Sequence, residues 1–451
     1  MKDIKKISAV YFLGIGGIGM SALARYFKSI GIKVSGYDKT PTILTAKLEE
    51  EGIDIHFEDN ISLIDKDAEL VVYTPAVPKD HKEYNYLKEN NYNVLKRSEV
   101  LGMITKSSYS ICVAGTHGKT TTSAMIAHLL RHSGFGCNAF LGGIATNYAT
   151  NFWPSEKNVS VAEADEYDRS FLKLFPDVAV ITAMDADHLD IYGTAEKLQD
   201  AFIEFANQVK PGGLLISKFG LSRSGEFKAA GKMSYSMQNN AADAYAENVK
   251  LNNGSYVFDI VIKNDSISGI ELNMGGMHNI ENAVAAITVA RHVGIAAEKI
   301  KAAVAAFRGV KRRFEYVVKN DDVVMIDDYA HHPEELRALI TGAKELFPGK
   351  KCSVVFQPHL FSRTKDFADG FAEVLSIADE VVLLPIYPAR EKPVEGVNSE
   401  MIMSRMKNRN VKVLSKEALI TEIKNNKPQL LITAGAGDID MLVEPLSAVI
   451  K

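Results

Sequence analysis

Residues 111–122, ICVAGTHGKTTT, decide the fold of the chain around them. A β-branched, apolar run ends in a short glycine-flanked loop, and a helical pattern begins at Lys119. A strand, a glycine loop and a helix N-terminus together form a pocket of backbone N–H groups that suits a phosphate. The lysine adds a charge for the β- and γ-phosphates, and the hydroxyl of Thr120 can bind Mg²⁺. The stretch therefore predicts a nucleoside triphosphate site made by Gly115, Thr116, His117, Gly118, Lys119, Thr120 and Thr121.

Length, composition and charge are those of an ordinary globular protein. The 451 residues predict roughly two to four domains, and 46% of them are hydrophobic. With 52 basic and 56 acidic side chains the net charge is −4, so no general affinity for nucleic acid or acidic membranes is expected. The three cysteines lack metal-ligand spacing, and no apolar run reaches transmembrane length. We expect a soluble, cytoplasmic protein without a nucleic acid or membrane partner.

Another glycine loop lies near the N-terminus, in residues 14–19, GIGGIG. A predicted strand over residues 7–13 precedes it, a predicted helix over residues 20–30 follows, and a strand over residues 33–37 ends at Asp38. This is the pattern of a Rossmann βαβ unit, whose glycines let the backbone approach a pyrophosphate. The pattern does not specify NAD, because any nucleotide with a diphosphate satisfies it. Asp38 either contacts a ribose or base, or only ends the strand.

Alternating strand-like and helix-like segments predict an α/β protein of three domains. We expect a Rossmann-like domain over residues 1–106, a central P-loop ATPase-like domain over 107–313, and a C-terminal Rossmann-like domain over 314–451. Short alternating runs in residues 232–272, around an Asn-Asn-Gly at 252–254, predict antiparallel strands and a hairpin. Other predicted strands are residues 159–162, 178–182, 214–217, 323–327, 353–356, 380–384 and 430–433, and predicted helices include 279–293 and 296–307.

Two acidic clusters follow predicted strands of the central domain. Residues 163–168, EADEYD, come after one strand, where a P-loop enzyme holds Mg²⁺. Residues 185–190, DADHLD, come after another, and aspartates with a histidine suit a second divalent ion. The alternatives are a solvated acidic loop in the first cluster and a helix cap in the second.

Three further segments carry side chains suited to ligands. Asn279 and Asn282 lie three residues apart at the start of a predicted helix, where amides can contact an adenine edge or cap the helix. Residues 327–333, DDYAHHP, and 357–364, QPHLFSRT, each follow a strand, and α/β sheets bind ligands at the carboxyl ends of their strands. Histidine pairs can bind metals, but no third ligand has a familiar spacing, so we expect substrate contact rather than zinc.

In their order along the chain, these motifs resemble those of the Mur ligases of peptidoglycan synthesis. The motifs are GIGGIGMS at 14–21, GTHGKTTT at 115–122, EADEYD at 163–168, DADHLD at 185–190, MHNIEN at 277–282, RRFE at 312–315, DDYAHHP at 327–333 and GAGDI at 435–439. The resemblance covers essentially the whole chain. It is greatest to the members that join L-alanine to UDP-N-acetylmuramic acid.

The resemblance implies an ATP-dependent ligation. ATP would phosphorylate the lactyl carboxylate of UDP-N-acetylmuramic acid, and the amine of L-alanine would attack the acyl phosphate to give an amide and phosphate. Because two anions must meet, Lys119 and Mg²⁺ would neutralise charge and fix the geometry. Closure of the C-terminal domain would exclude water from the acyl phosphate.

The resemblance also implies which residues surround ATP and the metal. Thr120 and Glu163 would hold one Mg²⁺, and His188 a second ion beside the γ-phosphate. Besides the loop 115–121, the residues around the nucleotide would be His278, Asn279, Asn282 and Arg313.

Two further groups are assigned to the substrates by the same resemblance. The backbone N–H groups of Gly16, Gly17 and Ile18 would face the UDP pyrophosphate, with Asp38 near the uridine. His331 and Arg363 would contact the incoming amino acid, and Arg363 suits its carboxylate.

Three features depart from the family pattern. Leu360 occupies a position where many members have arginine, Ala183 replaces a frequent asparagine, and residues 385–391, PIYPARE, differ from the shorter segment expected there. The change at Leu360 bears most on L-alanine as the acceptor, although Arg390 could supply the missing charge.

Three other functions explain part of the pattern. A recycling ligase that joins murein tripeptide to the same sugar nucleotide shares many motifs, but the DDYAHHP segment and compact length favour L-alanine. An NAD-dependent dehydrogenase would leave Lys119, Glu163 and Arg363 without a task. A regulator that slowly hydrolyses ATP predicts turnover indifferent to amino acids. The sequence does not indicate an oligomeric state.

Overall fold

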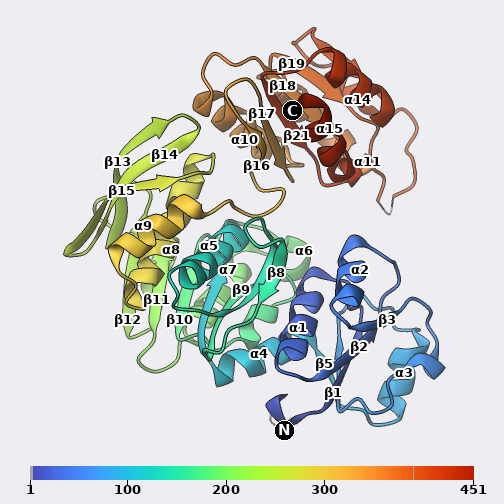
Figure 1. Cartoon of the computed structure of the whole chain (residues 1–451), viewed down its shortest axis with the longest axis vertical. Helices are drawn as coiled ribbons and strands as arrows, with labels where there is room; N and C mark the ends of the chain where they lie inside the picture. Colours follow the sequence, from blue (N-terminus) through green and yellow to red (C-terminus); the bar gives the residue numbers. More distant parts are fainter. Residues whose placement is uncertain (1–3, 390) are drawn as a thin grey trace. The chain divides into compact units, whose positions relative to one another are not determined.

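The computed structural model describes residues 4–389 and 391–451, and its strands form three sheets (Figure 1). Contacts between Cα atoms divide the chain into two compact units. The first comprises the chain up to Glu247 with residues 260–268 and 281–304, and the second comprises residues 248–259, 269–280 and 305–451. Parallel strands alternate with helices in each sheet, which confirms the predicted α/β class.

The first sheet has five parallel strands in the order β3-β2-β1-β4-β5. Its middle strand β1 (Ala9–Leu13) is wholly buried, as an apolar run in a covered parallel sheet should be. The strand order reverses between β1 and β4, so the loop after β1 lies where such sheets bind ligands. The other elements are α1 (Ile18–Ser29), β2 (Lys33–Tyr37), α2 (Ile43–Glu50), β3 (Asp54–His56), β4 (Leu70–Tyr73), α3 (Lys82–Glu89), β5 (Val94–Lys96) and α4 (Arg97–Ser107).

The second sheet has ten strands in the order β15-β14-β13-β12-β11-β10-β6-β9-β7-β8. Strand β6 (Tyr109–Ala114), which leads into the GTHGKT loop, pairs in parallel with β9 and β10. The other strands are β7 (Asn138–Ala145), β8 (Thr150–Trp153), β9 (Val159–Ala164), β10 (Val178–Ile181), β11 (Leu214–Lys218), β12 (Gly231–Ser236), β13 (Ala244–Asn252), β14 (Ser255–Ile262) and β15 (Asp265–Leu272). The helices are α5 (Lys119–His132), α6 (Leu189–Tyr192), α7 (Ala195–Ala206), α8 (Met277–His292) and α9 (Ala297–Ala306).

The predicted antiparallel segment is only partly correct. Strand β12 pairs in parallel with both β11 and β13, so the antiparallel prediction is wrong for this strand. Alternating residues indicate that one face is exposed, but they carry no information about the direction of the neighbouring strand. The hairpin is confirmed between β13 and β14, because Asn253 (φ 45°) and Gly254 (φ 74°) both have the positive φ of a type I′ turn.

The third sheet has the order β16-β17-β21-β18-β19-β20, and β16 pairs antiparallel at the edge of an otherwise parallel set. Its strands are β16 (Glu315–Lys319), β17 (Val324–Asp328), β18 (Cys352–Phe356), β19 (Glu380–Leu383), β20 (Val411–Val413) and β21 (Leu430–Ala434). Its helices are α10 (Pro333–Leu346), α11 (Phe361–Asp366), α12 (Ala368–Leu375), α13 (Ser399–Met403), α14 (Lys416–Asn425) and α15 (Val443–Ile450).

The first two sheets share one hydrophobic core, which joins side chains such as Phe12 and Phe27 to Phe140 and Phe152. Helix α1 packs against the β7–β8 hairpin, and α5 packs against β6, β7 and β9. All three cysteines are buried free thiols, as expected for Cys112 and Cys352. Among the described residues, no helix is both long and apolar enough to cross a membrane.

Candidate active site

The GTHGKT loop follows β6 and ends at α5. Gly115 (φ 141°) and Gly118 (φ 78°) adopt conformations that other residues rarely adopt. Space also requires glycine, because a Cβ on Gly115 would lie 2.0 Å from Thr182 Oγ1 and one on Gly118 2.7 Å from Asn282 Oδ1. The hydroxyl of Thr122 donates to the same amide oxygen of Asn282 at 3.1 Å. Asn282 therefore lies against the loop, which suits its predicted place beside a nucleotide.

Lys119, the first residue of α5, is held by its own loop and by a buried carboxylate. Its Nζ donates to the carbonyl oxygen of Gly115 at 2.6 Å and to Glu166 Oε1 at 2.9 Å. Glu166 is fully buried, whereas 14% of the Lys119 side chain is exposed. The carbonyl oxygen of Glu166 also accepts a hydrogen bond from the hydroxyl of Tyr192 at 2.6 Å. Glu166 was not singled out from its acidic cluster by sequence, because nothing local distinguishes it from its neighbours.

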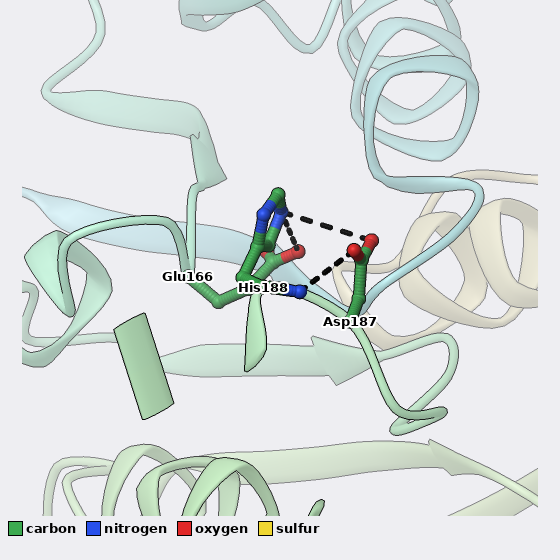
Figure 2. A group of neighbouring side chains, drawn as sticks. All are labelled: Glu166, Asp187 and His188. Atoms are coloured by element: carbon green, nitrogen blue, oxygen red, sulfur yellow. Dashed lines mark hydrogen bonds and ion pairs between the residues drawn. The ribbon is translucent and has the colours of Figure 1, made fainter. Parts of the chain in front are cut away.

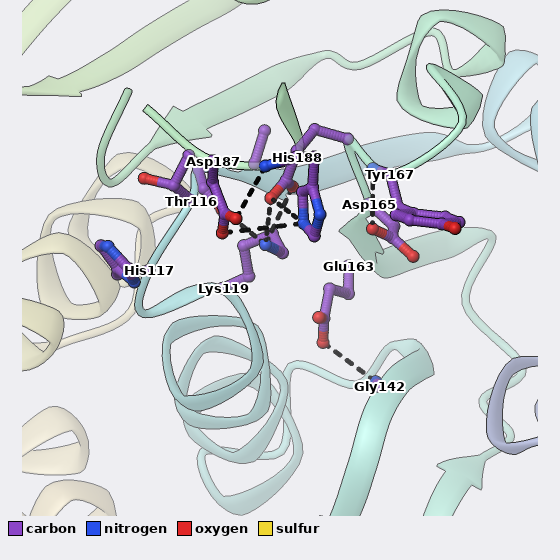
Figure 3. A network of polar contacts seen from close by, with 12 residues as sticks. Thr116, His117, Lys119, Gly142, Glu163, Asp165, Tyr167, Asp187 and His188 are labelled. Atoms are coloured by element: carbon purple, nitrogen blue, oxygen red, sulfur yellow. Dashed lines mark hydrogen bonds and ion pairs between the residues drawn. The ribbon is translucent and has the colours of Figure 1, made fainter. Parts of the chain in front are cut away.

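A second carboxylate from the same segment, that of Glu163, contacts Gly142 (Figure 3) and the next residue of α5. Thr120 Oγ1 donates to Glu163 Oε1 at 3.0 Å, and the backbone N–H of Gly142 in β7 donates to Glu163 Oε2 at 3.0 Å. Burial raises the pKa of Glu163, although the charge of Lys119 and the hydrogen bond from Thr120 oppose this. A hydroxyl and a carboxylate are oxygen ligands of the kind that Mg²⁺ prefers. This pair therefore fits the predicted magnesium site.

His188 completes a group of three possible metal ligands with Glu166 and Asp187 (Figure 2). Its Nε2 lies 3.7 Å from Glu166 Oε1 and 3.7 Å from Asp187 Oδ2, and the three ligand atoms all lie within 4.8 Å of one another. Two carboxylates and an imidazole can hold a divalent cation. Because Glu166 also pairs with Lys119, a cation here would share that carboxylate with the lysine.

The GIGGIG loop uses its own chain to satisfy much of its backbone. The N–H groups of Gly14 and Ile15 donate to the carbonyl of Tyr37 at 2.8 and 3.0 Å, and that of Gly17 to Gly14 at 3.3 Å. The N–H of Gly16 donates to Asp38 Oδ2 at 2.7 Å. Asp38 thus ties the end of β2 to the loop, a role that neither of the two sequence-based alternatives included.

A cavity of about 310 Å³ connects this loop with the carboxylate of Glu163. Arg97, at the start of α4, lines it and packs on the loop, since a Cβ on Gly19 would lie 2.7 Å from Arg97 Nη1. The cavity is lined by Gly17, Ile18, Gly19, Met20, Ala22, Leu23, Thr74, Arg97, Leu101, Phe140, Leu141, Gly142, Glu163 and Asp165. The GIGGIG loop and the carboxylate of Glu163 therefore line the same cavity. The sequence did not identify Arg97, because only the fold brings it to the loop.

The remaining predicted nucleotide residues lie at the start of α8 and before β16. Asn279 is 2% exposed, and its Nδ2 donates to the carbonyl of Gly275 at 2.6 Å; this bond is not a helix cap, in which the amide oxygen would accept a backbone N–H. His278 is exposed. The guanidinium of Arg313 lies 5.8 Å from the centre of the Tyr329 ring.

In the second unit, cationic side chains gather after β17. His331 Nδ1 lies 2.9 Å from the carbonyl oxygen of Tyr329, and its backbone N–H donates to Glu335 at 2.9 Å. Burial lowers the pKa of His331, and the charges of Arg363 and Arg313 lower it further, while Glu335 acts in the opposite direction. Arg363, on α11, is half-buried, and the described residues give it no carboxylate partner. This corner suits an anion such as an amino-acid carboxylate.

The two departures from the family pattern in this unit lie together. Leu360 has φ 70°, and its N–H donates to the carbonyl of Tyr387 at 3.0 Å. The ring of Tyr387 stacks on that of His359, with 5.8 Å between centroids. The segment from residue 385 therefore packs beside the predicted amino-acid site, but Arg390, the predicted substitute charge, lies outside the described residues.

A larger cavity, of about 530 Å³, lies at the edge of the third sheet where its strands begin. Its charged side chains pair with each other, Lys351 with Glu380 at 2.6 Å and Lys412 with Glu422 at 2.7 Å. We assign no substrate to it, because parallel sheets bind ligands at the opposite ends of their strands.

The chain is similar to known proteins over its full length. Family models match residues 9–109 (Mur ligase family, catalytic domain), 113–290 (Mur ligase middle domain) and 312–437 (Mur ligase, glutamate ligase domain). The UDP-N-acetylmuramate–L-alanine ligase of Flavobacterium johnsoniae is 50% identical over 100% of this chain and 99% of its own. The ligase of the same name from Parabacteroides distasonis is 49% identical over 99% and 98%.

Solved structures show the same fold. The crystal structure of the UDP-N-acetylmuramate–alanine ligase of Thermotoga maritima matches with a TM-score of 0.82 and 28% identity over 98% of both chains. A murein peptide ligase from Psychrobacter arcticus matches with a TM-score of 0.66 and 23% identity over 98% of both, which shows a shared fold alone. With three family models in order and near-complete coverage at half identity, the chain belongs to the Mur ligase family.

Proposed function

We propose that this chain is an ATP-dependent ligase that joins L-alanine to the lactyl carboxylate of UDP-N-acetylmuramic acid. The products are UDP-N-acetylmuramoyl-L-alanine, ADP and phosphate, for peptidoglycan precursor synthesis. The observation that carries the proposal is the single cavity that joins the GIGGIG loop to the carboxylate of Glu163, beside Lys119 and Thr120. The full-length relatives named UDP-N-acetylmuramate–L-alanine ligase support it. Since both substrates of the first step are nucleotides, we assign the enzyme to the cytoplasm.

The first step transfers the γ-phosphoryl group of ATP to a carboxylate oxygen of the sugar nucleotide. Lys119 exchanges Glu166 for the β- and γ-phosphates, so that a charge already held in the loop meets the substrate. Thr120 and Glu163 hold one Mg²⁺, and His188, with Glu166 and Asp187, a second. When bound, these ions offset the repulsion between the two anions. The loop 115–121 with His278, Asn279, Asn282 and Arg313 binds the nucleotide.

The sugar nucleotide and the amino acid are bound by groups from different sheets. The loop of Gly16, Gly17 and Ile18 holds the UDP pyrophosphate, and Asp38 keeps the loop in shape by accepting the N–H of Gly16, which is therefore not itself a donor to the pyrophosphate. His331 and Arg363 bind L-alanine, whose amine attacks the acyl carbonyl and releases phosphate. We assign binding of the sugar nucleotide to a domain of residues 1–106, binding of ATP to a domain of residues 107–313, and binding of the amino acid to a domain of residues 314–451.

The recycling ligase that accepts murein tripeptide is the alternative. It uses the same first step, so only the acceptor distinguishes the two. The test is phosphate release from ATP with Mg²⁺ and UDP-N-acetylmuramic acid, comparing L-alanine, L-Ala-γ-D-Glu-meso-diaminopimelate and no acceptor. Release stimulated mainly by L-alanine supports the proposal, release stimulated by the tripeptide supports recycling, and release with neither contradicts both.

A further inference from the structure

The hairpin of β7 and β8 contacts both ends of the proposed sugar-nucleotide cavity. On β7, the N–H of Gly142 donates to the Glu163 carboxylate at 3.0 Å. On β8, the Nδ2 of Asn151 donates to the carbonyl oxygen of Ile18 at 2.5 Å and to Ser21 Oγ at 3.0 Å. One rigid element of two strands therefore touches the carboxylate of the metal site and the first turn of the helix after the GIGGIG loop.

The amide of Asn151 can lie in only one orientation. Its Oδ1 accepts a hydrogen bond from Arg25 Nη1 at 2.5 Å, and Arg25 pairs with both carboxylate oxygens of Glu51 at 2.8–2.9 Å. Rotating the amide would set an NH₂ group against the guanidinium and an oxygen against the carbonyl of Ile18. Asn151 is fully buried, as is Ser21, so water does not replace these bonds.

Apolar packing at the same contact does not fix its register. Tyr26 of α1 packs against Phe140 and Phe152 of the hairpin, with ring centroids 5.4 and 6.2 Å apart. Such burial stabilises the contact but is not directional, whereas hydrogen bonds weaken steeply when their geometry is lost. The polar contacts of Asn151 are therefore the ones that can set where α1 lies along the hairpin.

We propose that Asn151 is a positioning residue for the ligation reaction, and this rests on the proposed function. By holding Ile18 at a set distance from Gly142 and Glu163, it aligns the lactyl carboxylate of the bound sugar nucleotide with the γ-phosphate. The residue touches no substrate itself. Its effect is on the alignment of two bound reactants, for which a displacement of about 1 Å can cost on the order of a hundredfold in rate.

Asn151→Asp is the sharpest variant. It keeps the acceptor for Arg25 but removes the donor and turns an oxygen toward the carbonyl of Ile18. Ser21→Ala removes one acceptor of Asn151 together with the hydroxyl that donates to the carbonyl of Ile18 at 2.9 Å, and is milder because the bond from Asn151 to Ile18 remains. Phe152→Leu, one residue along β8, is the matched control, because it weakens the same contact by packing alone. Each variant is assayed with L-alanine, ATP and UDP-N-acetylmuramic acid well below its Tm, next to the unaltered enzyme.

We expect kcat to fall about tenfold to a hundredfold in Asn151→Asp and less in Ser21→Ala, with the KM for ATP unchanged in both. Phe152→Leu should lower Tm and leave kcat unchanged. The inference is overturned if the kcat of Asn151→Asp and Ser21→Ala changes no more than that of the control at an equal loss of Tm. If Asn151→Asp does not fold, Ser21→Ala against the control decides. A failure of the proposed function is separate, since the unaltered enzyme would then show no release dependent on both substrates.

Discussion

The two glycine loops of the first unit have the same plan but differ in how they carry charge. Each joins a parallel strand to a helix, and each has glycines that the neighbouring side chains require. In the GIGGIG loop the backbone N–H of Gly16 is bound by Asp38, and no lysine is present. In the GTHGKT loop Lys119 is bound by buried Glu166. A loop that only holds a diphosphate needs backbone donors, whereas one that transfers a phosphoryl group also needs a charge it can move.

The strongest way to break this comparison is to remove the movable charge. Lys119→Met should lower kcat by roughly a thousandfold, because stabilisation of developing charge is lost in the transition state. The KM for UDP-N-acetylmuramic acid should change little, since the other loop is intact. Steady-state phosphate release measures both. Lys197→Met, at an exposed position of α7, is the control, and equal kcat values for the two variants would contradict the assignment.

Removing Glu166 tests whether this carboxylate holds the charge of Lys119 in the loop when no ATP is bound. Glu166→Gln leaves Lys119, with 14% of its side chain exposed, without its carboxylate, which should destabilise the protein by about 3 kcal/mol. ATP should then raise Tm more in Glu166→Gln than in the unaltered protein, because its phosphates replace the missing charge. Thermal unfolding with and without ATP checks this. Asp168→Asn, at an exposed acid of the same cluster, should behave like the unaltered protein.

Acid should destabilise α5, the helix after the GTHGKT loop, but not α1, the helix after the GIGGIG loop. On α5, His128 accepts from the hydroxyl of Tyr148 at 2.8 Å and lies 2.9 Å from the carbonyl of Ala303, and burial lowers its pKa to about 4. An unfolded chain binds a proton at this histidine below pH 6.5, so its contribution to stability is lost as the pH falls from about 6.5 to 4. The loss can reach about 3 kcal/mol.

His128→Gln should flatten this part of the pH dependence of unfolding. His132→Gln, at an exposed histidine one turn along the helix, should not. Hydrogen exchange at pH 7 and 5 locates the effect, which we expect in α5 and not in α1, which carries no histidine. An equal loss of protection from hydrogen exchange in α5 and α1 at pH 5 would contradict this prediction.

The smallest expected effect concerns the GIGGIG loop. Asp38→Ala leaves the Gly16 N–H without its acceptor, which should raise the KM for UDP-N-acetylmuramic acid about tenfold and change kcat little. Asp54→Ala, at an exposed residue of β3, is the matched control. A fall in kcat without a change in KM would mean that Asp38 acts on the chemistry and not on the shape of the loop.

Local patterns predicted both loops because a glycine loop is made by consecutive residues. The strand, the glycines, Lys119 and Thr120 all lie within 12 residues of sequence, 111–122. For the same reason the class of each domain and the Asn-Gly hairpin could be predicted. Glu163 could be found because it directly follows the buried part of a strand.

The partners of the loops could not be predicted, because the fold brings them in from far away in sequence. Glu166 lies 47 residues from Lys119, and Asn151 lies 133 residues from Ile18. The direction of β12 was missed for a related reason, since pairing depends on neighbours that a single strand does not specify. Asp38 was located correctly, but its bond to Gly16 depends on the turn between them.

Leu360 has a consequence for the engineering of this protein. At φ 70° a branched side chain costs folding free energy of about 1–3 kcal/mol, and the chain retains one there beside the proposed amino-acid site. Leu360→Gly should therefore raise the temperature of unfolding, as measured by calorimetry, by the strain that is relieved less the extra freedom that glycine gives the unfolded chain. If the KM for L-alanine rises in the same variant, heat resistance and acceptor selection compete at this one backbone position.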